Sequence, residues 1–232
     1  MKHLKENLNK VSARVTSACE RAGRNPAGIS ILAVSKKHPV DRILALHQMG
    51  LAAFGENYVQ EALAKIKIIQ SSKIQWHFIG PMQSNKTREV AENFQWVQSV
   101  DRTKILRRLS SQRPQHLPPL NICIQVNIDR EPQKAGVLPD SLKELAVMAS
   151  SLPNLCLRGL MAIPRAGSQL HDPSDSYQRM NTLFHDLLDE GLELDTLSMG
   201  MSGDLEAAIM HGSTMLRIGT DLFGPRPDGN QN

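Results

Sequence analysis

Apolar residues recur along this chain with two alternating spacings. Short runs of apolar and β-branched residues are typical of strands buried on both faces, whereas apolar residues three or four positions apart predict helices. The predicted strands are 29–34, 52–55, 74–79, 94–97, 120–126, 155–160, 196–199 and 214–218. The predicted helices are 4–18, 39–46, 59–69, 86–92, 101–109, 139–149, 173–190 and 204–210, with Asp101 as the N-cap of the fifth.

This alternation favours one fold class. Eight strands that alternate with helices predict an α/β protein, a single (β/α)8 TIM-type barrel with an added N-terminal helix. A doubly wound open sheet is the competing arrangement, but the chain lacks the glycine-rich phosphate motifs of Rossmann and P-loop proteins. We expect residues 1–224 to form the barrel domain and residues 225–232 to form a disordered tail.

Composition narrows the classes of partner. The chain has 232 residues, and no apolar run approaches the length of a membrane span. Its first residues lack the apolar region of a secretory signal, so we expect a cytoplasmic protein without a membrane partner. The net charge of +4 permits a nucleic-acid partner, but the basic residues are interleaved with acidic ones and no binding motif is present. Nucleic-acid binding is therefore not expected.

Cysteine and histidine give no sign of a metal site. The three cysteines are widely spaced, and neither a Cys-x-x-Cys pair nor a His-Glu-x-x-His motif is present. Cys123 and Cys156 lie in predicted strands, where we expect each thiol to behave as a small buried hydrophobe.

The first predicted strand leads directly to a lysine. Residues 29–34 are apolar or small, Lys36 follows, and Pro39 disfavours helix at His38. Lys36 should therefore stand at the carboxyl end of a strand, which is where barrels and open sheets bind ligands. Two interpretations remain open, a solvated loop lysine or a desolvated amine that forms a Schiff base with an aldehyde.

The last two predicted strands end in small and hydroxyl residues. Ser202 and Gly203 follow the seventh strand, and Gly219 and Thr220 follow the eighth. These two loops form the usual phosphate site of such barrels. A capped turn at residues 200–204 is the alternative, and the presence of Lys36 at the same mouth favours the anion site.

Arg217 lies between Leu216 and Ile218, so its side chain should point to the opposite face of the eighth strand. A buried arginine needs a partner. The partner is either a carboxylate in a structural salt bridge or a ring nitrogen of a bound cofactor. His77, in the middle of the third strand, is interpreted as a hydrogen-bonded core histidine.

Several of these segments together resemble a known family, the pyridoxal phosphate homeostasis proteins. The resemblance runs in order from about Val11 to Gly224. The segments that carry it are 32–36 (Leu-Ala-Val-Ser-Lys), 54–61 (Phe-Gly-Glu-Asn-Tyr-Val-Gln-Glu), 76–80, 83–86, 159–164, 197–202 and 217–220 (Arg-Ile-Gly-Thr).

The resemblance implies that pyridoxal 5′-phosphate is bound in a barrel similar to the N-terminal domain of alanine racemase. It implies a cofactor site made of Lys36 as the Schiff-base lysine, Asn57 lining the site, Ser202, Gly219 and Thr220 at the phosphate, and Arg217 facing the pyridine nitrogen. Lys134 matches a family lysine linked to cofactor handling. No catalytic residue and no metal ligand are implied.

The resemblance also implies a function in intracellular homeostasis of pyridoxal phosphate. Such a protein holds the cofactor and buffers it or delivers it to apo forms of cofactor-dependent enzymes, as a monomer or weak dimer rather than as an enzyme. The alternative is an amino-acid racemase or decarboxylase of the same fold type. Those enzymes carry a second, β-rich domain, and we expect none here because the chain ends soon after its eighth strand.

Overall fold

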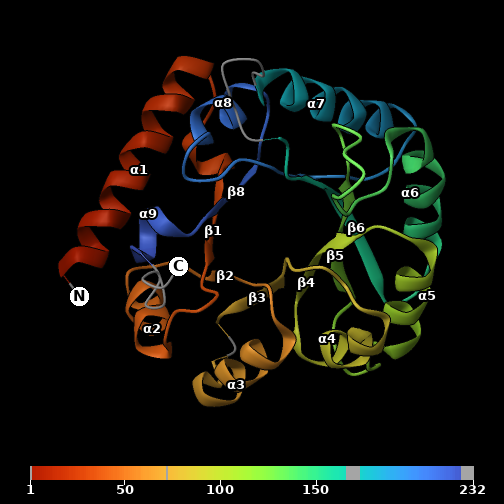
Figure 1. Cartoon of the computed structure of the whole chain (residues 1–232), viewed down its shortest axis with the longest axis horizontal. Helices are drawn as coiled ribbons and strands as arrows, with labels where there is room; N and C mark the ends of the chain where they lie inside the picture. The colour runs from red at the N-terminus through yellow and green to blue at the C-terminus, as the bar shows by residue number, and fades with distance from the viewer. Residues whose placement is uncertain (1, 72, 166–172, 226–232) are drawn as a thin grey trace.

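The computed structural model describes residues 2–71, 73–165 and 173–225. Its strands are all parallel and close in sequence order into a barrel in which β8 pairs with β1 (Figure 1). The closed barrel confirms the predicted fold class. The strands are β1 (Ser30–Val34), β2 (Ala53–Glu56), β3 (Gln75–Phe78), β4 (Trp96–Val100), β5 (Leu120–Val126), β6 (Leu155–Ala162), β7 (Thr196–Ser198) and β8 (Met215–Ile218).

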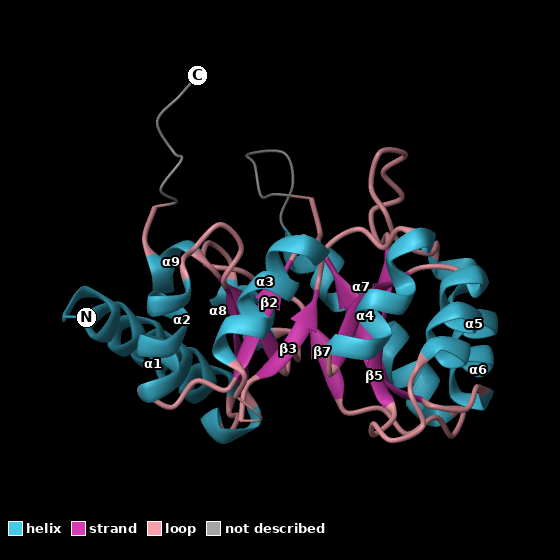
Figure 2. Ribbon diagram, turned by 90° about the horizontal axis from the view of Figure 1, so that it is seen from below, coloured by secondary structure: helices cyan, strands magenta, loops and turns pink. Residues whose placement is uncertain are grey.

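The helices surround the strands as an outer layer (Figures 1 and 2). The α-helices are α1 (Lys2–Ala22), α2 (Val40–Gln48), α3 (Val59–Ile69), α4 (Thr87–Asn93), α5 (Thr103–Gln112), α6 (Leu142–Ser151), α7 (Pro173–Asp189), α8 (Leu205–Met210) and α9 (Thr220–Phe223). Short 3-10 helices precede β1, α4 and α6 at η1 (Pro26–Gly28), η2 (Ser84–Lys86) and η3 (Pro139–Ser141). Within the described ranges, none of the helices is both long and apolar enough to span a membrane.

The strands are mostly apolar because most of their residues are covered on both faces of the barrel wall. Every residue of β4 and of β8 is buried, and the outward side chains of the barrel pack against the apolar faces of the helices. Parallel strands covered in this way read as near-continuous apolar runs rather than as alternating ones. This is why the sequence pattern located them.

Helix α1 precedes the barrel and packs against the side where β8 meets β1. It buries Val11, Val15 and Ala18 and lies against α8 and α9 (Figure 2). The loops that follow β7 and β8 lead into those two helices. The added helix is therefore in contact with the elements that carry two of the predicted phosphate-binding loops.

Some sequence-based predictions are wrong. Asp101 does not cap α5: the N-cap is Arg102, no side chain caps the helix, and the Asp101 carboxylate pairs with the Arg102 guanidinium instead. The fourth strand runs over 96–100 rather than 94–97. Cys156 is exposed although Cys123 is buried, because alternate residues at the start of β6 face solvent. The predicted disordered tail falls outside the described residues from position 226 onward.

Candidate functional site

Lys36 lies in a tight turn at the carboxyl end of β1. The Ser35 amide donates to the Gly55 carbonyl at 2.9 Å, which continues the pairing of β1 with β2, and the His38 amide donates back to the Ser35 carbonyl at 3.0 Å. The His38 ring stacks on Phe223 of α9 with 4.6 Å between centroids. Lys36 itself is partly buried. The backbone of Lys36 therefore lies just beyond the carboxyl end of β1, as predicted.

Asn57 follows β2 at the same mouth. A Cβ at Gly80 would lie 2.0 Å from the Asn57 carbonyl oxygen, so only glycine lets the loop after β3 approach this closely. Asn57 Oδ1 is buried without a hydrogen-bond partner among the described residues. Asn57 also lines a pocket of about 340 Å³ together with Tyr58 and Lys86. Its amide oxygen is therefore a buried acceptor that no described residue satisfies.

Gly219 brings the end of β8 beside the end of β1. A Cβ built at Gly219 would lie 3.6 Å from Val34, two residues before Lys36, which is an ordinary van der Waals contact. Its φ of −109° is open to any residue, so close packing within the protein does not itself demand glycine here. Thr220 follows and is exposed. The predicted phosphate residues of β8 therefore lie next to the strand that carries the lysine.

The loop after β7 contains a hydrogen-bonded turn at residues 201–204. Asp204 accepts a hydrogen bond from the Met201 amide at 2.6 Å and another from the buried Tyr177 hydroxyl at 2.8 Å. Burial and the neighbouring Asp204 carboxylate raise the pKa of Tyr177, so this hydroxyl remains a donor. The turn presents Ser202, whose Oγ accepts from the Asp221 amide at 3.4 Å. Residues 201–204 therefore form a capped turn, and Ser202 links the loops after β7 and β8, while the predicted anion site at these loops stays a prediction.

Arg14 of α1 ties these two loops from outside. Its guanidinium donates to the Ser202 carbonyl at 2.9 Å, to the Asp221 carboxylate at 2.6 Å and to both oxygens of Glu206 at 2.7 and 2.8 Å. Hydrogen bonding from Arg14 holds the pKa of Glu206 below its ordinary value. The sequence analysis did not identify Arg14, because its partners lie about 190 or more positions away along the chain.

Arg217 points into the barrel, as its strand position predicted. Its guanidinium donates to the Ser198 carbonyl at 2.7 Å, to the Ser198 hydroxyl at 2.8 Å and to the Ala162 carbonyl at 2.7 Å. Burial lowers its pKa to about 10, so it remains charged at neutral pH. Among the described residues no carboxylate pairs with it, which leaves the salt-bridge interpretation without support.

His77 is a hydrogen-bonded core residue, as expected. Its Nδ1 lies 3.0 Å from Gln98 Nε2, and Gln98 Oε1 accepts from the Ser198 hydroxyl at 2.7 Å. Because Gln98 donates to Nδ1, the proton of the neutral ring belongs on Nε2. Burial lowers the pKa of His77 to about 3, so the ring is neutral at physiological pH. A polar chain therefore links His77 through Gln98 and Ser198 to Arg217.

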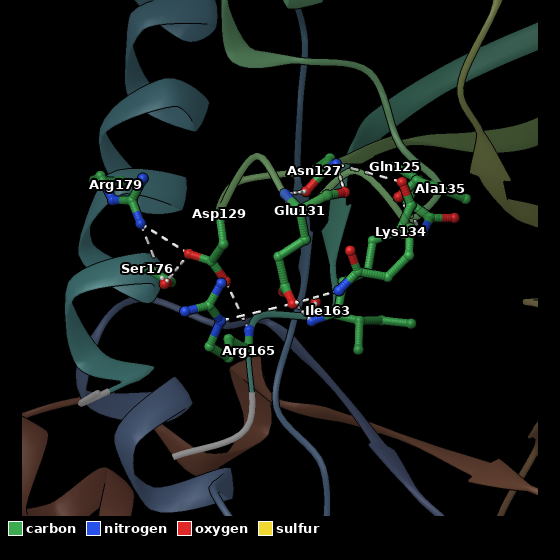
Figure 3. Close-up of polar contacts among 11 residues, drawn as sticks. Gln125, Asn127, Asp129, Glu131, Lys134, Ala135, Ile163, Arg165, Ser176 and Arg179 are labelled. Atoms are coloured by element: carbon green, nitrogen blue, oxygen red, sulfur yellow. Dashed lines mark hydrogen bonds and ion pairs between the residues drawn. The ribbon is translucent and has the colours of Figure 1, made fainter. Parts of the chain in front are cut away.

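Lys134 lies in the loop after β5, beside Glu131 and Ile163 (Figure 3). Its Nζ is 2.6 Å from Glu131 Oε1 and donates to the Ile163 carbonyl at 3.3 Å. Asn127 holds this loop by accepting from the Glu131 amide at 3.1 Å and donating to the Glu131 carbonyl at 2.8 Å. Lys134 therefore belongs to an ion pair of its own loop.

Asp129 connects the same loop to α7 (Figure 3). Its carboxylate accepts from the Arg165 amide at 2.6 Å, from the Ser176 hydroxyl at 2.5 Å and from Arg179 at 2.8 Å. Burial alone would raise the pKa of Asp129, but these hydrogen bonds together hold it below its ordinary value. A charged network thus joins the loop after β5 to α7.

The geometry suits a ligand that carries an aldehyde, a ring and a phosphate. The turns and loops after β1, β2, β7 and β8 converge at one end of the barrel and carry Lys36, Asn57, Ser202 and Thr220, and the buried Arg217 lies inside the barrel. Within the described ranges no three histidine, cysteine or acidic side chains cluster as a metal site would require. The convergent residues are Lys36, Asn57, Ser202, Arg217, Gly219 and Thr220.

A family model for the N-terminal domain of alanine racemase matches residues 2–227. Among curated relatives, the pyridoxal phosphate homeostasis protein of Pseudomonas aeruginosa is 53% identical over 229 residues, covering 99% of this chain and 98% of the relative. The protein of the same name from Escherichia coli K12 is 47% identical over 229 residues, covering 97% and 98%.

Solved structures agree with these relatives. PipY of Synechococcus elongatus, solved with pyridoxal phosphate bound, has a TM-score of 0.80 at 34% identity and covers 92% of this chain and 100% of its own. An alanine racemase of Clostridium difficile has a TM-score of 0.73 at 16% identity, and the match covers 99% of this chain but 58% of the racemase. The second likeness shows the shared barrel fold alone.

Proposed function

Because the chain belongs to the family of pyridoxal phosphate homeostasis proteins, we propose that it binds pyridoxal 5′-phosphate through Lys36 and buffers or delivers it inside the cell. PipY, a structural neighbour, is named as binding this cofactor. Asn57, Ser202, Arg217, Gly219 and Thr220 make up the rest of the proposed site.

One observation carries the proposal: the end of β1 and the loop after β8 are in contact. Gly219 lies against Val34, and the turn that follows Val34 carries Lys36. A single molecule with its phosphate at Gly219 and Thr220 can therefore present an aldehyde to Lys36. Lys36 would supply the amine that forms a C=N bond with this aldehyde, with release of one water molecule.

Arg217 sets the electronic character of the proposed site. A protonated pyridine ring is the electron sink on which the cofactor's carbanion chemistry depends. A guanidinium that stays charged at neutral pH cannot accept a proton, so it can only donate to the ring nitrogen and keep that nitrogen unprotonated. This arrangement weakens the electron sink, but alanine racemases resemble the chain in this feature, so Arg217 alone does not decide between holding the cofactor and using it.

Binding and release, rather than amino-acid chemistry, is the proposed activity. Racemisation needs an acid–base group on each face of the bound amino acid, and Lys36 is the one such group that we assign. We therefore propose a carrier that passes pyridoxal phosphate to apo enzymes.

Transfer and exchange measurements test this function together. Protein loaded with pyridoxal phosphate should be yellow, and it should restore activity to an apo enzyme that requires the cofactor.

In deuterated water, loaded protein mixed with alanine or serine should give slow or undetectable exchange at Cα. Exchange near the typical enzyme turnover of about 10 per second would restore the racemase interpretation. Failure to reactivate the apo enzyme would contradict delivery.

A further inference from the structure

A buried ammonium group lies beneath the turn that carries Lys36. Lys65 of α3 donates to the Ser35 carbonyl at 2.8 Å, to Glu56 Oε1 at 2.7 Å and to Glu61 Oε1 at 2.6 Å. These three acceptors match the three protons of a lysine ammonium. The Lys65 side chain is 8% exposed and that of Glu56 is fully buried. We name Glu56, Lys65 and Glu61 the clamp.

The clamp grips the backbone on both sides of Lys36. On one side, Lys65 binds the Ser35 carbonyl, and the Ser35 hydroxyl donates to Glu56 at 2.6 Å. On the other side, Glu61 accepts from the Lys37 amide at 2.5 Å. Lys37 has a φ of 63°, a left-handed conformation that a lysine adopts only when its surroundings impose it. The residue between the two grips is Lys36.

Stability alone is a poor explanation for this arrangement. Removing charges from water is costly, and well-packed apolar residues often stabilise a fold as much as a buried ion pair does. Position 65 lies on the buried face of α3, where an apolar residue would be the ordinary choice. The bonds that the clamp makes beyond itself go to Ser35 and Lys37, not to a neighbouring helix.

We propose that Glu56, Lys65 and Glu61 are positioning residues that fix the origin of the Lys36 side chain and so direct its amine to the aldehyde of the cofactor. The inference rests on the proposed function, in which Lys36 forms the covalent bond. A lysine side chain is a flexible four-carbon stem, so the reach of its amine depends on a fixed backbone. Among the described residues, no hydrogen bond or ion pair joins the clamp side chains to Ser202, Gly219 or Thr220.

The test compares two ligands that differ in one group. Pyridoxal phosphate carries the aldehyde, whereas pyridoxine phosphate carries an alcohol and cannot form a C=N bond. Clamp variants should bind pyridoxal phosphate at least about tenfold more weakly, a change of about 1.4 kcal/mol. Their affinity for pyridoxine phosphate should stay within about twofold of wild type, about 0.4 kcal/mol. The visible band of the loaded protein should weaken in parallel.

Two sets of variants keep the test free of unfolding. The double variant Glu56→Gln with Lys65→Met removes both buried charges together, because removing one alone would leave an unpaired charge. Glu61 is 27% exposed, so Glu61→Ala leaves the buried Glu56–Lys65 pair in place. Glu61→Gln retains an oxygen for Lys65 and for the Lys37 amide. It should restore most of the preference for the aldehyde that Glu61→Ala loses.

Arg113 supplies the matched control. It is also a buried cation bonded to backbone carbonyls, those of Ala91 and Phe94 at 2.6 and 2.8 Å, but it lies at the opposite end of the barrel. Arg113→Met should lower the free energy of unfolding and leave the ratio of the two affinities unchanged.

The possible outcomes distinguish a failure of the clamp proposal from a failure of the proposed function. If wild-type protein prefers pyridoxal phosphate and the clamp variants keep that preference, the inference is wrong and the proposed function stands. If the clamp variants lose affinity for both ligands equally, the clamp has a structural role alone. If wild-type protein shows no preference for the aldehyde, the proposed function fails, and the inference fails with it.

Discussion

The two sides of the proposed site are held in different ways. On the lysine side, the turn after β1 is held by the almost completely buried Glu56 and Lys65 and by the partly exposed Glu61, which come from the next strand and helix. On the phosphate side, the loops after β7 and β8 are tied from outside by Arg14, which is 35% exposed and reaches across most of the sequence. The covalent step needs a fixed amine, whereas a phosphate can be met by loops that adjust.

The two sides also differ in the direction in which the pKa of their buried or partly buried glutamate is shifted. On the lysine side, burial outweighs the attraction of Lys65 and raises the pKa of Glu56. On the phosphate side, the hydrogen bond from Arg14 outweighs burial and lowers the pKa of Glu206. Partly exposed pairs are screened by solvent and contribute less. The comparison predicts that aldehyde binding and phosphate binding can be weakened separately.

The largest difference between phosphate binding and aldehyde binding is expected from Ser202→Ala combined with Thr220→Ala. Hydrogen bonds to charged groups contribute about 1.5–3 kcal/mol each. The loss of two such bonds should weaken the binding of pyridoxal phosphate by about 10² to 10⁴ fold. The affinity for unphosphorylated pyridoxal should stay nearly unchanged, and equilibrium titration measures both. Ser150→Ala with Ser151→Ala is the control, because those hydroxyls bond within α6. Equal losses for both ligands would show that Ser202 and Thr220 do not contact phosphate.

The pH dependence of unfolding should distinguish Glu56→Gln from Glu206→Gln. A raised pKa means that the contribution of Glu56 is present below the ordinary value of 4.5 and is lost as pH rises above it. The wild-type advantage over Glu56→Gln should therefore shrink with rising pH, by about 1.4 kcal/mol per unit of pKa displacement. For Glu206, whose pKa is lowered, the advantage should shrink as pH falls below 4.5. Denaturant titrations across this range measure both, and slopes of the same sign would contradict the comparison.

The smallest effect is expected from Arg14→Met. Its ion pairs are about one-third exposed, so their loss should cost about 1 kcal/mol or less. Arg14 holds the two phosphate loops together. The affinities for pyridoxal phosphate and pyridoxine phosphate should therefore fall by the same factor, about three- to fivefold. A selective loss of the aldehyde ligand would place Arg14 on the lysine side and break the comparison.

The parts of the site that sequence analysis predicted depend on local pattern. Lys36 follows a continuous apolar run, and Arg217 interrupts another, so strand periodicity alone placed both of them. The Asp101 cap was wrong because an adjacent arginine takes its carboxylate and α5 begins at Thr103. Helix α9 was not predicted because four residues carry no periodicity.

The supporting residues could not be assigned from the sequence. Lys65 left one signal, a charge at a position where the spacing of α3 calls for an apolar side chain, but its partners Ser35 and Glu56 belong to other elements. Arg14 gave no signal in the sequence, because an arginine on a partly exposed helix face is ordinary. Its acceptors, the Asp221 carboxylate and the Ser202 carbonyl, come close to it only when the barrel closes. Tertiary structure creates both roles.

Borohydride reduction followed by peptide mass mapping tests the central claim most directly. Borohydride converts the C=N bond to a stable amine, so every lysine that held the aldehyde is marked permanently. We predict that the pyridoxyl phosphate adduct lies on the peptide containing Lys36, that Lys36→Ala abolishes it, and that Lys134→Ala leaves it intact. An adduct found on another lysine, with Lys36 unmodified, would contradict the assignment.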